Sequence, residues 1–220
     1  MAEKEKILEL KNVVYSFHTY GGEVKAVRDV SFEVRKGEIL GIVGESGCGK
    51  SVTAQCIMRL NPEPPGFFEG GEILFKGQDV LKMSNKELRK FRGREIGFVF
   101  QDPMTSLNPT MRVGAQIEEV FLGRTDVTKK EVKEKALDIM RLVGISDVEK
   151  RYRQYPHELS GGMKQRIMIA IALVSRPGVI ICDEPTTSLD VTIEAQILDL
   201  LLELRDKLGT SIIMITHDLG

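Results

Sequence analysis

The sequence has no long apolar run, no excess of either charge and very little cysteine. Its longest apolar run, Ile167–Val174, falls far short of the roughly 18 residues that a membrane-spanning helix needs. Lys and Arg number 31 against 32 Asp and Glu, a net charge of −1, so the basic footprint of a nucleic-acid-binding domain is missing. With 42% apolar and 29% charged residues, the composition also excludes a disordered or collagen-like chain.

The three cysteines, at positions 48, 56 and 182, form no Cys-x-x-Cys pair and no disulfide framework. We therefore expect a reducing, cytoplasmic compartment, and buried or loop positions for the thiols rather than metal binding. The charged start, Met1–Lys6, precedes no apolar segment, so we expect no secretory signal. With 220 residues, the chain can form one large domain or two small ones and needs no disulfide to hold a core.

The first hundred residues read as β-strands with one longer helix among them. β-Branched residues concentrate in 7–14 and 26–34, as in half-buried strands. The apolar run Ile39–Val43 predicts a strand covered on both faces. From 51 to 60 apolar residues recur every four positions, which predicts a helix that Asn61-Pro62 ends.

Shorter signals continue this pattern. Strands are predicted at 73–75 and 96–100, and Phe67-Phe68, between proline and glycine pairs, is predicted as a loop lying on the sheet. Two sequences, Ser84–Glu87 and Thr128–Glu131, match the capping box, in which a hydroxyl and a carboxylate reciprocally satisfy free backbone N–H groups. Each predicts the start of a helix.

The rest of the chain is helical first and then alternates between strand and helix. Residues from about 103 to 175 read as mostly helical, and apolar strands return at 179–182 and 212–215 with a helical stripe, 193–208, between them. No internal repeat is visible. The order is therefore a mixed β start, a helical insertion, and an alternating β and α end.

Residues Gly44–Ser51, GESGCGKS, match the phosphate-loop pattern G-x-x-x-x-G-K-[ST] at every fixed position. A predicted strand precedes the loop and a predicted helix follows it. Glycines allow successive backbone N–H groups to face one anion, and the helix N-terminus adds partial positive charge. We expect Lys50 to reach the β- and γ-phosphates and Ser51 to bind Mg²⁺. The alternative is a chance glycine turn.

A second motif is the apolar run Val179–Cys182 followed by Asp183 and Glu184. A buried strand ending in Asp183 can place that carboxylate beside Ser51, where it holds the metal directly or through water. Glu184, one residue further, can polarise a water aimed at the γ-phosphate. Alone this pattern is weak, because any buried strand can end in an acidic turn; beside a complete phosphate loop it favours a nucleotide site.

A third motif, Leu159–Met163, leads into an amphipathic helix. Its serine and two glycines present a hydroxyl and bare N–H groups at a helix start, which is a second possible anion-binding terminus. Taken alone, it is better explained as an ordinary helix cap with flexible glycines.

In this order, the phosphate loop, Leu159–Met163, Asp183-Glu184, Ser188–Asp190 and His217 resemble the motif set of an ABC-type ATPase subunit. The resemblance covers essentially the whole chain. It implies an α/β, P-loop NTPase fold with an N-terminal antiparallel β portion and a helical insertion. It also implies three segments: a nucleotide-binding core at 1–100, a helical signature subdomain at 101–175, and a return to the core at 176–220.

The resemblance also implies a role for each motif. Gln101 matches the Q-loop, which senses Mg²⁺, and His217 matches the switch histidine, which holds the γ-phosphate. Leu159–Met163 matches the signature, which contacts the γ-phosphate of nucleotide bound to a partner subunit, and Asp190 matches the D-loop, which lies across the dimer. Phe17 aligns best with the aromatic residue that stacks on adenine, with Tyr15 and Tyr20 as alternatives.

Three sets of site residues follow. Those expected to act in catalysis are Glu184, His217, Lys50 and Gln101. Those expected to contact ATP are Phe17, Gly44, Glu45, Ser46, Gly47, Cys48, Gly49, Lys50, Ser51, Val52, Ser160, Gly161, Gly162 and Asp190. Those expected to hold Mg²⁺ are Ser51, Gln101 and Asp183.

Two features depart from the family pattern. The signature usually ends in glutamine, and here Met163 removes one polar contact across the dimer. Ser160, Gly161 and Gly162 remain, so we expect a competent site. The chain ends at Gly220, where members of the family continue with further strands and helix, and we therefore expect a C-terminal part to be truncated.

A narrower resemblance is to ATPases of oligopeptide and dipeptide importers. It is carried by Gln101–Pro109, Tyr155–Ser160 and Asp183–Leu198. It implies ATP hydrolysis that energises peptide uptake, at the cytoplasmic face of a prokaryotic membrane. The implied partners are a second ATPase subunit, membrane permeases and, indirectly, an extracytoplasmic solute-binding protein, with no nucleic acid. Alternatives are nickel or sugar importers, and a soluble ABC-type ATPase that acts on nucleic acid or ribosomes.

Overall fold

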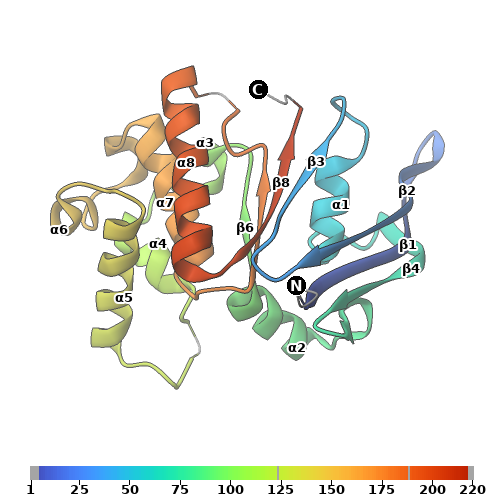
Figure 1. The fold of residues 1–220 in the computed structure, drawn as a ribbon, viewed down its shortest axis with the longest axis horizontal. Helices are drawn as coiled ribbons and strands as arrows, with labels where there is room; N and C mark the ends of the chain where they lie inside the picture. The colour runs from blue at the N-terminus through green and yellow to red at the C-terminus, as the bar shows by residue number, and fades with distance from the viewer. Residues whose placement is uncertain (1–4, 123, 188, 218–220) are drawn as a thin grey trace.

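The computed structural model describes residues 5–122, 124–187 and 189–217, and it has two β-sheets with helices gathered mainly on one side (Figure 1). The first sheet is antiparallel, with the strand order β2-β1-β4-β5. Its strands are β1 (Lys6–Thr19), β2 (Gly22–Arg35), β4 (Gly66–Phe75) and β5 (Gln78–Asp79). Because β1 and β2 are long and joined by a tight turn, they form a hairpin that positions one wall of the site described below.

The second sheet is parallel, with the order β3-β8-β7-β6. Its strands are β3 (Ile39–Val43), β6 (Ile96–Val99), β7 (Val179–Asp183) and β8 (Ser211–Thr216). The carboxyl ends of β3 and β7 therefore lie at the same edge of the sheet, and β8 separates them. This topology brings the segments that follow residues 43 and 183 together, although 140 positions separate them in sequence.

The helices fall into three groups. One helix follows β3, α1 (Lys50–Ile57), and one precedes β6, α2 (Asn85–Lys90). A larger group lies on the opposite side of the parallel sheet from the antiparallel one (Figure 1): α3 (Pro103–Ser106), α4 (Val113–Glu119), α5 (Lys129–Leu142), α6 (Val148–Arg151) and α7 (Gly161–Leu173). The last helix, α8 (Val191–Leu208), connects β7 to β8. Short helical turns occur at Val80–Lys82, Phe91–Glu95 and Pro156–Glu158.

The parallel sheet has a hydrophobic core on each face. In β7, Ile180 and Cys182 contact the core shared with α5, α7 and α8. Val179 and Ile181 point the other way, into the core shared with α1 and the antiparallel sheet. This alternation follows from the two-residue period of a strand, and it explains why β7 is apolar at every position before Asp183. Within the described residues, no helix is long and apolar enough to cross a membrane.

Both predicted capping boxes are confirmed. The Ser84 hydroxyl accepts a hydrogen bond from the Glu87 N–H at 3.4 Å, and the Ser84 N–H donates to Glu87 Oε2 at 2.8 Å. Thr128 and Glu131 make the same pair of bonds at 3.3 and 2.7 Å. Each box satisfies two backbone donors that a helix start leaves free, so α2 and α5 begin where the sequence predicts.

Two local predictions near the phosphate loop hold only in part. Strand β3 packs against both cores, through Ile39 on one face and Leu40 and Ile42 on the other, but Val43 at its end is 44% exposed. Helix α1 does not reach Leu60 but ends at Ile57. Arg59 adopts a positive φ of 50°, and the Leu60 N–H donates back to the Gln55 carbonyl at 2.9 Å. This is the usual left-handed helix ending, with arginine in place of glycine.

Phe67-Phe68 is also not a loop, because β4 includes both residues. The register pairs Phe68 with Tyr15 of β1, and their rings meet edge-on with centroids 4.7 Å apart. The flanking glycines indicated a loop, but Gly71 instead allows close approach to β1: a Cβ there, at φ +96°, would meet the backbone of Asn12 at 2.5 Å. Pairing across the sheet overrides the local turn signal.

Gly97 allows β6 to pack closely against α7. A Cβ at this position would overlap the carbonyl oxygen of Ala172, and neither backbone can shift without disturbing the core. We expect Gly97→Ala to lower the free energy of unfolding by about 1–3 kcal/mol, the usual cost of overpacking. Urea unfolding monitored by circular dichroism measures it. Gly93→Ala is the control, since a Cβ there meets nothing within 4 Å. An equal effect of both substitutions would contradict this account.

Candidate active site

The loop Gly44–Ser51 joins the end of β3 to the start of α1. Gly47 and Gly49 have positive φ values of 79° and 96°, which L-residues with side chains rarely adopt. A Cβ on Gly49 would also overlap the carbonyl oxygen of Ala26 in β2. The glycines therefore allow the loop to curve tightly against the antiparallel sheet and to end at the N-terminus of α1.

Lys50 folds over its own loop. Its Nζ donates hydrogen bonds to the carbonyl oxygens of Gly44 at 2.7 Å and Glu45 at 2.8 Å, and the residue is only 8% exposed. The ammonium group is thus held at the concave side of the loop. An anion bound there would meet this charge together with the backbone N–H groups of the helix start.

A cavity of about 740 Å³ opens beside the loop. This is within the size range of typical small-molecule and cofactor sites. Its walls come from the loop and α1, from β2, and from two residues distant in sequence. The lining residues are Val24, Lys25, Ala26, Val27, Arg28, Val30, Ser46, Gly47, Cys48, Gly49, Lys50, Ser51, Val52, Thr53, Gln101 and Glu184.

Asp183 ends β7 and contacts the loop directly. The Ser51 hydroxyl donates to Asp183 Oδ1 at 2.9 Å, so the predicted pairing of these two residues is present. Asp183 is 5% exposed, and burial raises the pKa of its carboxyl, an effect that the Ser51 hydrogen bond opposes. The two oxygens lie at the carboxyl edge of the parallel sheet, facing the start of α1.

Glu184 follows with a left-handed backbone, φ 46°. Its N–H donates to the Ile215 carbonyl of β8 at 3.0 Å, and its own carbonyl accepts from the Thr187 N–H at 3.2 Å. These two bonds stabilise a conformation that is unusual for a residue with a side chain. Glu184 lines the cavity, and Asp183 does not.

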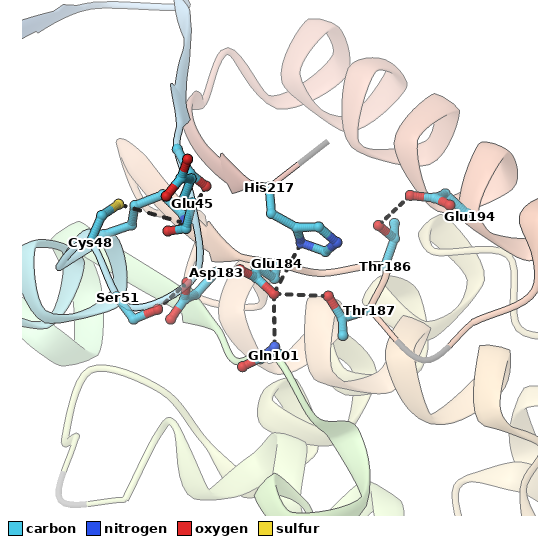
Figure 2. A network of polar contacts seen from close by, with 12 residues as sticks. Glu45, Cys48, Ser51, Gln101, Asp183, Glu184, Thr186, Thr187, Glu194 and His217 are labelled. Carbon is cyan, nitrogen blue, oxygen red and sulfur yellow. Dashed lines mark hydrogen bonds and ion pairs between the residues drawn. The ribbon is translucent and has the colours of Figure 1, made fainter. Parts of the chain in front are cut away.

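One oxygen of Glu184, Oε2, is the centre of a polar network (Figure 2). Gln101 Nε2 donates to it at 2.8 Å and the Thr187 hydroxyl at 3.1 Å, while His217 Nδ1 lies 3.4 Å away. Gln101 comes from the end of β6, and His217 from the end of β8. The structure thus brings Gln101, Glu184 and His217, three of the residues expected to act in catalysis, into one network. The fourth, Lys50, lies outside this network but lines the same cavity as Gln101 and Glu184.

Another predicted group lies apart from this cavity. Ser160, Gly161 and Gly162 form the N-terminus of α7, where the Ser160 hydroxyl caps the helix by accepting from the Met163 N–H at 3.4 Å. None of them lines the cavity. A Cβ on Gly162 would meet Ile193 of α8 at 3.0 Å, which places the starts of α7 and α8 side by side.

Asp190 caps the neighbouring helix α8 by accepting from the Ile193 N–H at 3.0 Å. It too is absent from the cavity lining, and Ser188 of the same motif lies outside the described residues. The starts of α7 and α8 therefore form one surface, and its serine, glycine and aspartate face solvent.

The predicted aromatic residue also lies outside the cavity lining. Phe17 is half-buried on β1, edge-on to Tyr15 at 5.3 Å between centroids. Of the two alternatives, Tyr15 is fully buried, so it has no face free for stacking, and Tyr20 is fully exposed.

Sequence reasoning missed two parts of the site. The first is residues 24–30 of β2, which form a wall of the cavity; only the strand pairing reveals that this hairpin reaches the loop. The second is the pair Thr186 and Thr187. Thr187 lies three residues after Glu184 in a turn, where threonine hydroxyls often bond nearby groups. This spacing could have indicated the bond from the sequence.

The comparisons with known proteins agree with this geometry. A family model described as "ABC transporter" matches residues 27–187. The oligopeptide transport ATP-binding protein OppD of Bacillus subtilis (strain 168) is 57% identical over 100% of this chain and 62% of its own length. The dipeptide transport ATP-binding protein DppD of the same organism is 54% identical over 98% of this chain and 64% of its own. The chain thus spans less than two thirds of the length of these relatives.

A solved structure described as the dimeric post-hydrolysis state of the ATP-binding cassette MJ0796, bound to ADP and Pi, superposes with a TM-score of 0.83 at 29% identity. The match covers 96% of this chain and 88% of that one. CbiO1 from Clostridium perfringens, described as part of an ABC transporter complex, gives 0.81 at the same identity, over 98% of this chain and 80% of its own. The predicted fold class, an ABC-type P-loop α/β fold with an antiparallel β portion and a helical insertion, is confirmed.

Proposed function

Because this chain belongs to the ABC transporter family, we propose that it binds and hydrolyses ATP as the energising subunit of an ABC importer. The observation that carries the proposal is the convergence on one cavity of the phosphate loop, the Ser51–Asp183 pair and the Glu184 carboxylate. An anion cradle, a pair of oxygen ligands and a possible general base are the parts that hydrolysis of a nucleoside triphosphate requires.

The chemistry is divided among the residues by their positions. Lys50 and the loop N–H groups neutralise the phosphates. Glu184, in the cavity lining, orients a water molecule and accepts its proton as the water attacks the γ-phosphate. Gln101 and His217 lie at the same carboxylate, and we assign them to sensing the γ-phosphate end of the nucleotide.

Mg²⁺ fits the oxygens beside the loop. Ser51 Oγ and Asp183 Oδ1 are 2.9 Å apart. Gln101 bonds Glu184 through its amide nitrogen, and within the part of the chain that the structure describes its amide oxygen accepts no hydrogen bond. Hydroxyl, carboxylate and amide oxygens suit a hard cation. The described residues hold no cluster of three or more His, Cys, Asp or Glu, which agrees with a cation bound mainly through nucleotide phosphates. When bound, Mg²⁺ would neutralise phosphate charge.

The solvent-exposed start of α7 suggests a second ATPase subunit as partner, because it is built to bind an anion and lies outside this chain's own cavity. The MJ0796 cassette, described as dimeric, supports this assembly. We propose permease subunits as further partners and the cytoplasmic face of a prokaryotic membrane as the location, with a solute-binding protein acting indirectly.

We propose di- and oligopeptides as the transported solutes. Support comes from the relatives, which are named oligopeptide and dipeptide transport ATP-binding proteins. These names do not favour nickel or sugar import, or action on nucleic acid.

The test is to reconstitute the full-length protein with its membrane and solute-binding subunits in vesicles. ATP-dependent uptake of a labelled tripeptide, without uptake of nickel or maltose, is expected. Uptake of either alternative without the peptide would refute peptide import.

Lys50→Ala is expected to remove ATP binding, since the variant loses the ammonium that neutralises phosphate charge. Saturation at 100 times the dissociation constant stabilises a protein by about 2.7 kcal/mol, which raises the Tm of a chain of this size by several degrees. Differential scanning fluorimetry should therefore show an ATP-dependent rise for the wild type and for Lys130→Ala, an exposed lysine on α5, but none for Lys50→Ala. Equal shifts in all three proteins would refute the role of Lys50.

A further inference from the structure

Two adjacent threonines after Glu184 make separate bonds in opposite directions (Figure 2). The Thr187 hydroxyl donates to Glu184 Oε2 at 3.1 Å. The Thr186 hydroxyl donates to Glu194 Oε1, in the first turn of α8, at 2.6 Å. The turn between β7 and α8 is thus tied at one end to the helix and at the other to the carboxylate that faces the cavity.

The contacts of the Glu184 carboxylate are uneven. Gln101, Thr187 and His217 all approach Oε2, and each carboxylate oxygen has about two lone-pair positions. The donors of Gln101 and Thr187 are enough to fill those of Oε2. The second oxygen, Oε1, makes no hydrogen bond or ion pair among the described residues. The network therefore fixes which oxygen is held and which is left for a ligand or water.

The donors around Oε2 differ in how firmly they are held. Gln101 is exposed at the end of β6, and the His217 side chain is 56% exposed. Thr187 is half-buried, and its N–H also bonds the Glu184 carbonyl at 3.2 Å. Through Thr186 the same turn is fixed to Glu194. Thr187 is thus the donor whose position depends least on the other segments around the cavity.

We propose that Thr187 is a positioning residue for Glu184, and that Glu194 supports it by anchoring the turn through Thr186. The hydroxyl of Thr187 holds Oε2, so that Oε1 faces the cavity and the attacking water. This role rests on the proposed function, because it matters only if Glu184 acts on that water. Thr187 itself touches neither the nucleotide nor the water.

The expected effect follows from geometry. Without the Thr187 hydroxyl, Oε2 keeps the exposed Gln101 donor, and the carboxylate can rotate away from its productive orientation. Misplacing a reacting group by about 1 Å can cost about 100-fold in rate. Thr187→Val, which keeps the shape and loses the donor, should therefore reduce kcat by about 10–100-fold. The KM for ATP and the ATP-dependent rise in Tm should not change.

The test measures ATP hydrolysis by the full-length protein assembled with its partner subunits. Thr187→Ser restores a hydroxyl and should recover most of the kcat. Thr210→Val is the matched control, because it removes a buried hydroxyl that donates to the Pro177 carbonyl at 2.9 Å, away from the network; it should lower Tm and leave kcat unchanged. Glu194→Gln keeps an acceptor for Thr186 and should be milder than Glu194→Ala.

Single-turnover hydrolysis separates the possible results. In a Glu184→Gln background, Thr187→Val should add no further loss, because its effect passes through the carboxylate. The proposal is overturned if Thr187→Val keeps kcat within about twofold of wild type, or if Thr187→Ser is as slow as Thr187→Val; Thr187→Ala takes its place in both comparisons if the valine variant does not fold. If Glu184→Gln is itself fully active, the proposed function fails instead, and the two failures are distinct.

Discussion

Glu184→Gln is expected to preserve ATP binding and to slow ATP hydrolysis by about 10²–10⁴-fold, the range attributed to a well-placed general base. The carboxylate lies in the cavity lining with Oε2 held by Gln101 and Thr187. An amide keeps nearly the same size and can still accept a hydrogen bond through its oxygen. It cannot accept a proton from water, so the chemical step alone should fail.

Phosphate release by the full-length protein with its partner subunits measures this effect, and the ATP-dependent rise in Tm measures binding separately. Glu134→Gln, an exposed carboxylate on α5, is the control for removing one negative charge. The assignment of Glu184 would be wrong if the variant released phosphate at nearly the wild-type rate. Loss of the Tm shift would instead indicate a role in holding nucleotide.

The neighbouring carboxylate cannot take over this role. Asp183 is buried, bonded to the Ser51 hydroxyl, and directed at the loop rather than into the cavity lining. Glu184 instead lines the cavity, and its carboxylate bonds Gln101 and Thr187. Two adjacent acids therefore have different surroundings, one suited to a cation and the other to a water molecule.

The parts of the site that could be predicted are those coded by contiguous residues. The phosphate loop needs glycines at fixed positions to curve around an anion, and Asp183-Glu184 needs only a buried strand before it. Capping boxes predicted the starts of α2 and α5 because each depends on bonds within four residues. In these cases the sequence contains all of the interacting groups.

The remainder depends on pairing between distant segments. The edge position of β3 and the inclusion of Phe67-Phe68 in β4 follow from strand order and register, which local patterns do not specify. The wall of the cavity formed by β2 is a consequence of the same pairing. The spacing of Thr187 after Glu184 could indicate a local bond, but the oxygen that it holds, Oε2, is defined by the backbone turn at Glu184.

A second large effect on ATP hydrolysis is expected from changes at the start of α7. Ser160, Gly161 and Gly162 present a helix N-terminus outside this chain's own cavity, so the phosphates of one ATP cannot fill both termini. We expect this terminus to serve nucleotide bound to an opposing subunit. The isolated chain should then be a poor ATPase whose specific activity rises with protein concentration, or on adding the partner ATPase and membrane subunits.

Ser160→Arg should abolish this gain in specific activity on assembly, while ATP binding to the phosphate loop of the same chain stays intact. A bulky side chain at the N-cap of α7 blocks approach of the opposing nucleotide, and losing one preorganised donor to transition-state charge costs about 10²–10³-fold in rate. Ser84→Arg is the matched control, because it removes the corresponding cap of α2 and should lower stability by about 1 kcal/mol without affecting the gain. A dilute chain that hydrolyses ATP at a concentration-independent rate, unchanged by Ser160→Arg, would show that each subunit completes its own site. The start of α7 would then be an ordinary helix cap.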